Sequence, residues 1–70
     1  MIRARKIHAG SYEYTDGERT VEVIRIPPNP AYGDKDDMWI AIASWDRNLY
    51  TDPLPNKWMA VEDAKNMINR

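Results

Sequence analysis

The sequence contains no cysteine, one histidine and three glycines, and these shortages exclude several kinds of chemistry. Without cysteine the chain forms no disulfide, and one histidine cannot build a structural zinc site, which takes about four nitrogen or sulfur ligands. The scattered Gly10, Gly17 and Gly33 do not form a phosphate-binding loop. We therefore expect no cofactor and no zinc.

Catalytic groups are also scarce. His8 is the only histidine, and neither Ser11 nor Ser44 lies in a nucleophile-elbow pattern. The acidic stretch 34–37 resembles the start of a calcium-binding loop, but Trp39 and Trp45 occupy the positions where that loop needs Gly and Glu. We therefore expect neither an enzyme nor a metal-binding protein.

Long apolar runs and an excess of one charge are missing as well. Ten Lys and Arg stand against eleven Asp and Glu, for a formal net charge of −1, which by itself favours no particular partner. No segment approaches the roughly 20 apolar residues that cross a bilayer, and the first residues contain no apolar signal-peptide core. These absences predict a cytoplasmic protein without a membrane segment.

The longest apolar run, residues 38–46, predicts a central β-strand within one small domain that spans residues 1–70. Isoleucine and tryptophan favour strands, and the run contains no Gly or Pro. Side chains alternate between the two faces of a strand. One face carries Trp39, Ala41, Ala43 and Trp45, and the other carries Met38, Ile40, Ile42 and Ser44. The alanines leave a shallow trough, which either the helix of the chain itself or a partner molecule can occupy.

The flanking segments predict an antiparallel hairpin and a return. Alternation over residues 2–9 predicts a strand that continues towards Tyr14. Asp16 and Gly17 are typical of a hairpin turn, with a loop of about two or three residues, and the β-branched segment 20–26 predicts the second strand. Residues 49–51 predict either a short fourth strand or an extended return.

The C-terminal segment predicts one helix over residues 59–68, with Asn56 as its cap and Trp58 packed under its first turn. Its apolar side is formed by Val61, Ala64, Met67 and Ile68. Together the segments predict an α+β fold. In it a small three- to four-stranded antiparallel sheet, a β-hairpin plus the central strand, is packed by one C-terminal α-helix. The helix covers either the isoleucine face or the alanine face, and the opposite face stays partly open.

The first functional hypothesis is a non-enzymatic protein-binding module. Three Trp and four Tyr in 70 residues supply aromatic anchors, and the acidic stretch leads directly into Trp39. The composition is typical of accessory proteins of phages and mobile elements, so we expect a small inhibitor or adaptor that acts by occlusion. Its partner is another protein, and a second copy of the chain is an alternative. The predicted partner-binding residues are Tyr32, Asp34, Asp36, Asp37, Trp39 and Trp45.

The alternative hypothesis is a nucleic-acid-binding domain that uses the sheet and its basic N-terminal strand. The net charge of −1 and the isoelectric point near 5.7 argue against it, because nucleic-acid-binding domains usually carry a basic excess. The residues that would contact nucleic acid are Arg3, Arg5, Lys6, Arg19, Arg25 and Arg47.

Overall fold

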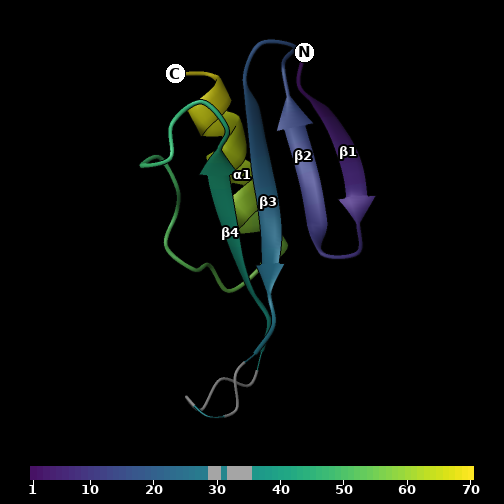
Figure 1. The fold of residues 1–70 in the computed structure, drawn as a ribbon, viewed down its shortest axis with the longest axis vertical. Helices are drawn as coiled ribbons and strands as arrows, with labels where there is room; N and C mark the ends of the chain where they lie inside the picture. Colours follow the sequence, from purple (N-terminus) through teal and green to yellow (C-terminus); the bar gives the residue numbers. More distant parts are fainter. Residues whose placement is uncertain (29–30, 32–35) are drawn as a thin grey trace.

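The fold consists of a four-stranded antiparallel sheet with one helix on one of its faces (Figure 1). The computed structural model describes residues 1–28, 31 and 36–70. The strands pair in the order β1-β2-β3-β4, which is also their order in the sequence. The elements are β1 (Arg3–His8), β2 (Ser11–Thr15), β3 (Thr20–Ile26), β4 (Met38–Ala43) and α1 (Lys57–Ile68). The predicted α+β fold is therefore confirmed.

The first hairpin differs from the prediction of one strand running on towards Tyr14. The chain reverses at Gly10, whose φ of +84° lies in the left-handed region that glycine adopts at little cost. His8 then pairs with Ser11, and the backbone N–H of Arg25 donates a hydrogen bond to the Gly10 carbonyl at 2.8 Å. This turn contains no Asp-Gly or Asn-Gly pair, and for that reason the sequence pattern did not reveal it.

The second hairpin confirms the predicted turn at Gly17. Thr15 pairs with Thr20, so the loop contains residues 16–19 and is longer than either loop considered from the sequence. The Asp16 carboxylate accepts hydrogen bonds from the backbone N–H groups of Glu18 and Arg19, each at 2.9 Å. The Asp16 side chain therefore satisfies two backbone donors that the sheet leaves free.

Strand β4 has neighbours on both of its edges. It ends at Ala43, sooner than the apolar run predicts, and segment 49–54 returns along its outer edge. Trp39 donates its backbone N–H to Leu54 at 2.8 Å, and Leu54 donates back to Trp39 at 2.7 Å. This segment forms only isolated bridges with β4. Of the two predictions for residues 49–51, the extended return is therefore the one observed, and the segment is not a further strand of the sheet.

The helix covers the alanine face of the sheet. Ala41 and Ala43 of β4 are buried in one core cluster with Ala60 and Ala64 of α1, and these small side chains allow helix and sheet to approach closely. The trough predicted from the sequence is thus filled by the chain's own helix. The buried core consists of Tyr14, Val21, Val23, Ala41, Ala43, Ala60, Val61, Ala64, Met67 and Ile68.

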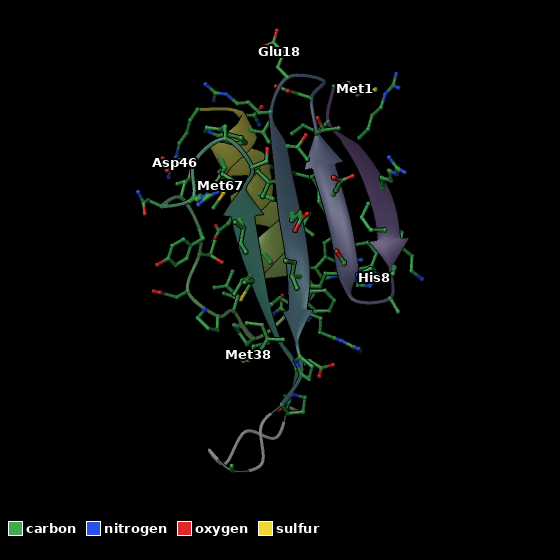
Figure 2. All side chains as sticks on the ribbon, viewed as in Figure 1. Met1, His8, Glu18, Met38, Asp46 and Met67 are labelled. Carbon is green, nitrogen blue, oxygen red and sulfur yellow. The ribbon has the colours of Figure 1, made fainter. Side chains whose placement is uncertain are left out.

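The opposite face of the sheet is not covered by the helix, as Figures 1 and 2 show from that side. The registers pair Ile24 with Ile40 and Glu22 with Ile42, and these residues alternate with the buried valines and alanines. The centre of this face is therefore apolar, although its isoleucines are only partly exposed because they shield one another.

The helix begins at Lys57, two residues before the predicted start, and Asn56 caps it as predicted. The prediction that Trp58 packs under the first turn is wrong, because this side chain is 77% exposed. With 3.6 residues per turn, Trp58 lies about 60° from Val61 and about 120° from Ala64 around the helix axis, so it falls at the edge of the buried stripe. Among the described residues, no helix is long and apolar enough to cross a membrane.

Candidate functional site

The outer face of α1 carries two exposed apolar side chains at its N-terminal end. Trp58 is 77% exposed and Met59 is 43% exposed. Within the part of the chain that the structure describes, they are the only large exposed apolar residues that follow one another in the sequence. Tryptophan and methionine are both enriched at protein interfaces. This end of the helix is therefore the strongest candidate for a binding surface.

Two carboxylates border this apolar pair. Glu62 follows Trp58 by four residues and Asp63 follows Met59 by four, so each lies one turn further along the same side of the helix. The four side chains line an open hollow of about 280 Å³. We call Trp58, Met59, Glu62 and Asp63 the Trp58 surface.

The helical turn that carries the Trp58 surface is held in place by a cap, a cation–π contact and core packing. Asn56 accepts a hydrogen bond from the backbone N–H of Met59 at 3.0 Å. The Lys57 ammonium lies 3.7 Å from the centroid of the Tyr12 ring, a cation–π contact that joins the start of the helix to β2. Ala60 and Val61 then enter the core. The exposed tryptophan is thus held on a rigid element and not on a loop.

The carboxylates of the Trp58 surface form no ion pair among the described residues. Among the described residues, neither Glu62 nor Asp63 has a Lys, Arg or His nitrogen within 4.0 Å, the limit for an ion pair. Their charges are therefore available to a cationic group on another molecule.

The acidic part of the predicted site is only partly described. Tyr32 and Asp34 lie outside the described residues. Asp36 is exposed, and a carboxylate oxygen of Asp37 lies 3.7 Å from a guanidinium nitrogen of Arg25. Asp37 is therefore engaged within the chain.

The two tryptophans of the predicted site lie apart. Trp39 is half-buried on the helix side of the sheet, where its ring centroid is 6.3 Å from that of Tyr12. Trp45 is 42% exposed, and the Arg19 guanidinium carbon lies 5.4 Å from its ring centroid. Trp39 lies near the start of β4 and Trp45 follows its end, and the strand from Trp39 to Ala43 alone spans about 13 Å. One anchor pocket cannot receive both.

The basic residues of the alternative site are also spread over the molecule. Arg19 hydrogen-bonds the backbone carbonyl groups of Ile68 and Arg70 at one end of the sheet, and Arg25 lies at the other end. Arg47 is exposed in the turn after β4. Only Arg3, Arg5 and Lys6 lie together, on β1.

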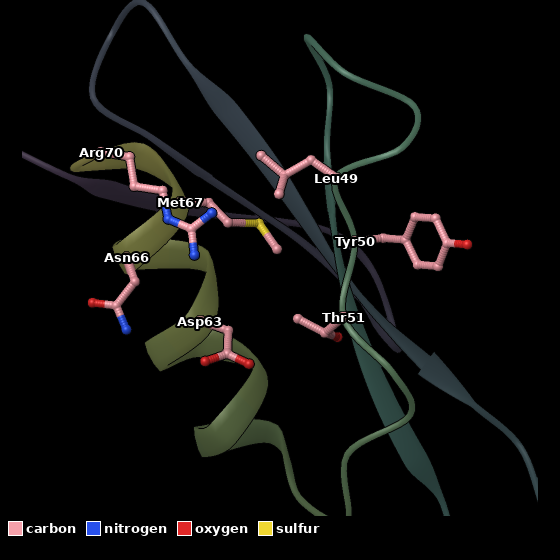
Figure 3. A pocket seen from close by; sticks show the side chains of 7 residues that line it. All are labelled: Leu49, Tyr50, Thr51, Asp63, Asn66, Met67 and Arg70. Carbon is pink, nitrogen blue, oxygen red and sulfur yellow. The ribbon is translucent and has the colours of Figure 1, made fainter.

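A second hollow, of about 210 Å³, lies between segment 49–51 and the C-terminal half of α1 (Figure 3). Leu49 and Met67 point towards one another across it, and the Tyr50 ring points away from the helix. Asp63 lines this hollow as well as the Trp58 surface. The hollow therefore extends that surface and does not form a separate enclosed pocket.

Comparison of the chain with protein-family models, curated proteins and solved structures gives no match. Within the described ranges, no three His, Asp or Glu side chains gather in a way that could hold a metal ion.

The Trp58 surface is absent from the sequence predictions because Trp58 was expected to pack under the first turn of the helix. The signal was present in the helical spacing. Trp58 lies about 60° from Val61 and about 40° from Glu62 around the helix axis, so it falls at the edge of the apolar stripe, on its polar side.

Proposed function

We propose that this chain is a protein-binding module and that the Trp58 surface is its contact site. The observation that carries the proposal is the 77% exposure of Trp58 on a capped, well-packed helix, directly beside the exposed Met59. This pair of exposed apolar side chains supports an interaction site, since keeping a large indole in water does nothing for the fold.

The chemistry of the surface suggests the chemistry of the partner. Tryptophan is among the commonest hot-spot residues and inserts into apolar pockets. Glu62 and Asp63 lie beside it without cationic partners among the described residues, so they favour lysine or arginine at the rim of that pocket. The partner we propose is therefore a protein with an apolar pocket bordered by basic side chains.

The mode of action that fits this surface is occlusion. One helix face that fills a groove with an indole and two carboxylates blocks whatever else uses the groove, including an anionic ligand. This is how a small inhibitor or adaptor works, and we propose that role for the chain, as an accessory protein of a phage or mobile element. The proposal gives the chain no catalytic role.

A nucleic-acid-binding sheet is the second candidate, and the observation in its favour is that Arg3 and Arg5 share the uncovered face of the sheet. Glu13 and Glu22 lie directly opposite one another on that same face, between Arg5 and the isoleucines. Two adjacent carboxylates repel a phosphate backbone. We therefore favour a protein partner over nucleic acid.

The experiment is affinity capture by the tagged chain from a lysate of its native host, with and without nuclease. We expect a protein that survives nuclease, that is recovered by a Trp45→Ala variant, and that is lost with Trp58→Ala. The stability of Trp58→Ala should stay within about 0.5 kcal/mol of the unmodified chain, as for most surface substitutions. Recovery that disappears on nuclease treatment, or equal recovery by Trp58→Ala, would overturn the proposal.

A further inference from the structure

The two outer edges of the sheet differ in whether another segment of the chain pairs with them. Segment 49–54 bonds to the outer edge of β4 through Trp39 and Leu54. Among the described residues, no strand pairs with the outer edge of β1, which is the outermost strand in Figure 1. In an edge strand, alternate residues direct both their backbone N–H and C=O groups away from the sheet. In β1 these groups point to solvent and can pair with another chain.

Strand β1 also stands clear of the helix. All six of its residues are exposed, and α1 contacts β2, β3 and β4 but not β1, which the structure describes in full. A segment approaching this edge therefore meets no helix in its way. Such a segment would add a fifth strand to the sheet.

The side chains of β1 give this edge a strong positive charge. Arg3 and Arg5 point to the uncovered face of the sheet, and Lys6 points to the helix side. No carboxylate of the described residues lies within 4.0 Å of their nitrogens. Cations therefore flank the free backbone on both faces, and although Glu13 is the cross-strand neighbour of Arg5, it forms no ion pair with Arg5.

We infer that β1 binds an extended acidic segment of another protein as an additional β-strand. Backbone hydrogen bonds along the edge supply one part of the recognition, and carboxylates at alternating positions opposite Arg3 and Arg5 supply the other. The pairing register shifts between Lys6 and His8, with Ile7 as the unpaired residue of a bulge, so the regular edge available to the segment is short. This site is separate from the Trp58 surface and does not depend on it.

A second copy of the chain is a poor occupant of this edge. An antiparallel pairing of two β1 strands centred on Ala4 would place Arg3 of one copy opposite Arg5 of the other. Like charges directly opposite one another destabilise a strand pair. The same basic side chains that repel a second copy attract an acidic segment, and this charge pattern decides between the two occupants.

The test is the binding of short labelled peptides to the full chain at low ionic strength, followed by fluorescence anisotropy. One peptide alternates Glu and Thr, and a second alternates Lys and Thr. Two further versions of the Glu peptide carry N-methyl groups on one or the other alternating set of residues. Only one of those sets faces β1 in a strand pair, so its methylation removes the hydrogen bonds while the charge is unchanged.

We expect the Glu peptide to bind and the Lys peptide to bind at least about tenfold more weakly, the size expected when several exposed ion pairs are lost. One N-methylated peptide should lose binding and the other should keep it. The double variant Arg3→Glu and Arg5→Glu should also weaken the Glu peptide about tenfold, whereas Trp58→Ala should leave it unchanged.

Equal binding of the two N-methylated peptides would overturn the inference, because it would show attraction by charge without strand pairing. Absence of Glu peptide binding would do the same, since β1 would then be only a charged edge that resists aggregation. Displacement of the peptide by an oligothymidylate of equal charge at lower concentration would reassign the edge to nucleic acid. Circular dichroism of each variant checks that the sheet is intact.

Discussion

The side-chain oxygen of Asn56 accepts a hydrogen bond from the backbone N–H of Met59 at 3.0 Å, and this bond fixes where the helix begins. Trp58 lies within the turn that the bond closes. The cap therefore does two things: it satisfies a backbone donor that the helix leaves free, and it orients the exposed indole.

Replacing Asn56 should reduce stability through this bond alone. We expect Asn56→Ala to lower the free energy of unfolding by about 1 kcal/mol, the usual cost of losing an N-cap, and Asn56→Asp to preserve it. Urea denaturation followed by circular dichroism measures both. Equal stability of the Ala and Asp variants would show that the cap contributes nothing to this helix.

The close approach of helix and sheet depends on alanine at several positions. Ala41, Ala60 and Ala64 are each 0% exposed and belong to one core cluster. Ala64→Leu should therefore destabilise the fold by about 1–3 kcal/mol, because the larger side chain pushes the helix away from β3 and β4. The exposed neighbour provides the control, since Lys65→Leu should change stability by less than about 0.5 kcal/mol. Similar losses in the two variants would contradict this packing.

The Asp16 carboxylate in the second hairpin loop should contribute to the loss of stability at acidic pH. Backbone N–H groups of Arg19 and Glu18 donate to the Asp16 carboxylate and lower its pKa from the ordinary value of 3.8. The unfolded chain therefore binds this proton more readily than the folded chain. The contribution of Asp16 is present above pH 3.8 and is lost as the pH falls through the lower folded pKa.

Asp16→Asn isolates this component, since asparagine keeps the acceptor oxygen but does not titrate. We expect the unfolding free energy of the variant to fall less steeply below pH 3.8 than that of the unmodified chain. Urea titrations at a series of acidic pH values measure the difference. Parallel curves would mean that the carboxylate has the same pKa in both states.

The carboxylates of the Trp58 surface should set the salt dependence of partner binding. The double variant Glu62→Gln and Asp63→Asn should bind the captured partner more weakly. Its affinity should also depend less on salt concentration, because two charges facing a basic rim are removed. Asp36→Asn with Asp37→Asn removes the same charge from the acidic stretch named in the sequence analysis. Surface plasmon resonance over a range of salt concentrations compares them, and a larger effect of the second pair would return the site to that stretch.

Much of the fold could be predicted from the sequence because local patterns determine it. Asp16 and Gly17 mark their turn, the β-branched segment 20–26 coincides with β3, and the stripe through Val61 and Ala64 gives the buried side of the helix. The turn at Gly10 escaped because Ala9 and Gly10 contain no paired turn residues.

The face covered by the helix could not be chosen from hydrophobicity, because isoleucine and alanine faces are both apolar. Side-chain size makes the choice, since a helix approaches Ala41 and Ala43 more closely than Ile40 and Ile42. The site was misplaced for a related reason. Apolar character suggested that Trp58 was core, but the phase of the helix places it outside.

The central claim is that Trp58 lies in the contact with a protein partner, and site-specific photo-crosslinking tests it most directly. A photoreactive phenylalanine analogue would replace Trp58, Ile40 on the uncovered sheet face, or Trp45, in separate full-length chains exposed to the native lysate. We predict one crosslinked protein product from position 58 that persists after nuclease treatment and is absent from positions 40 and 45. Crosslinks from position 40 or 45 with none from 58 would contradict the account and place the contact on the sheet or its edge.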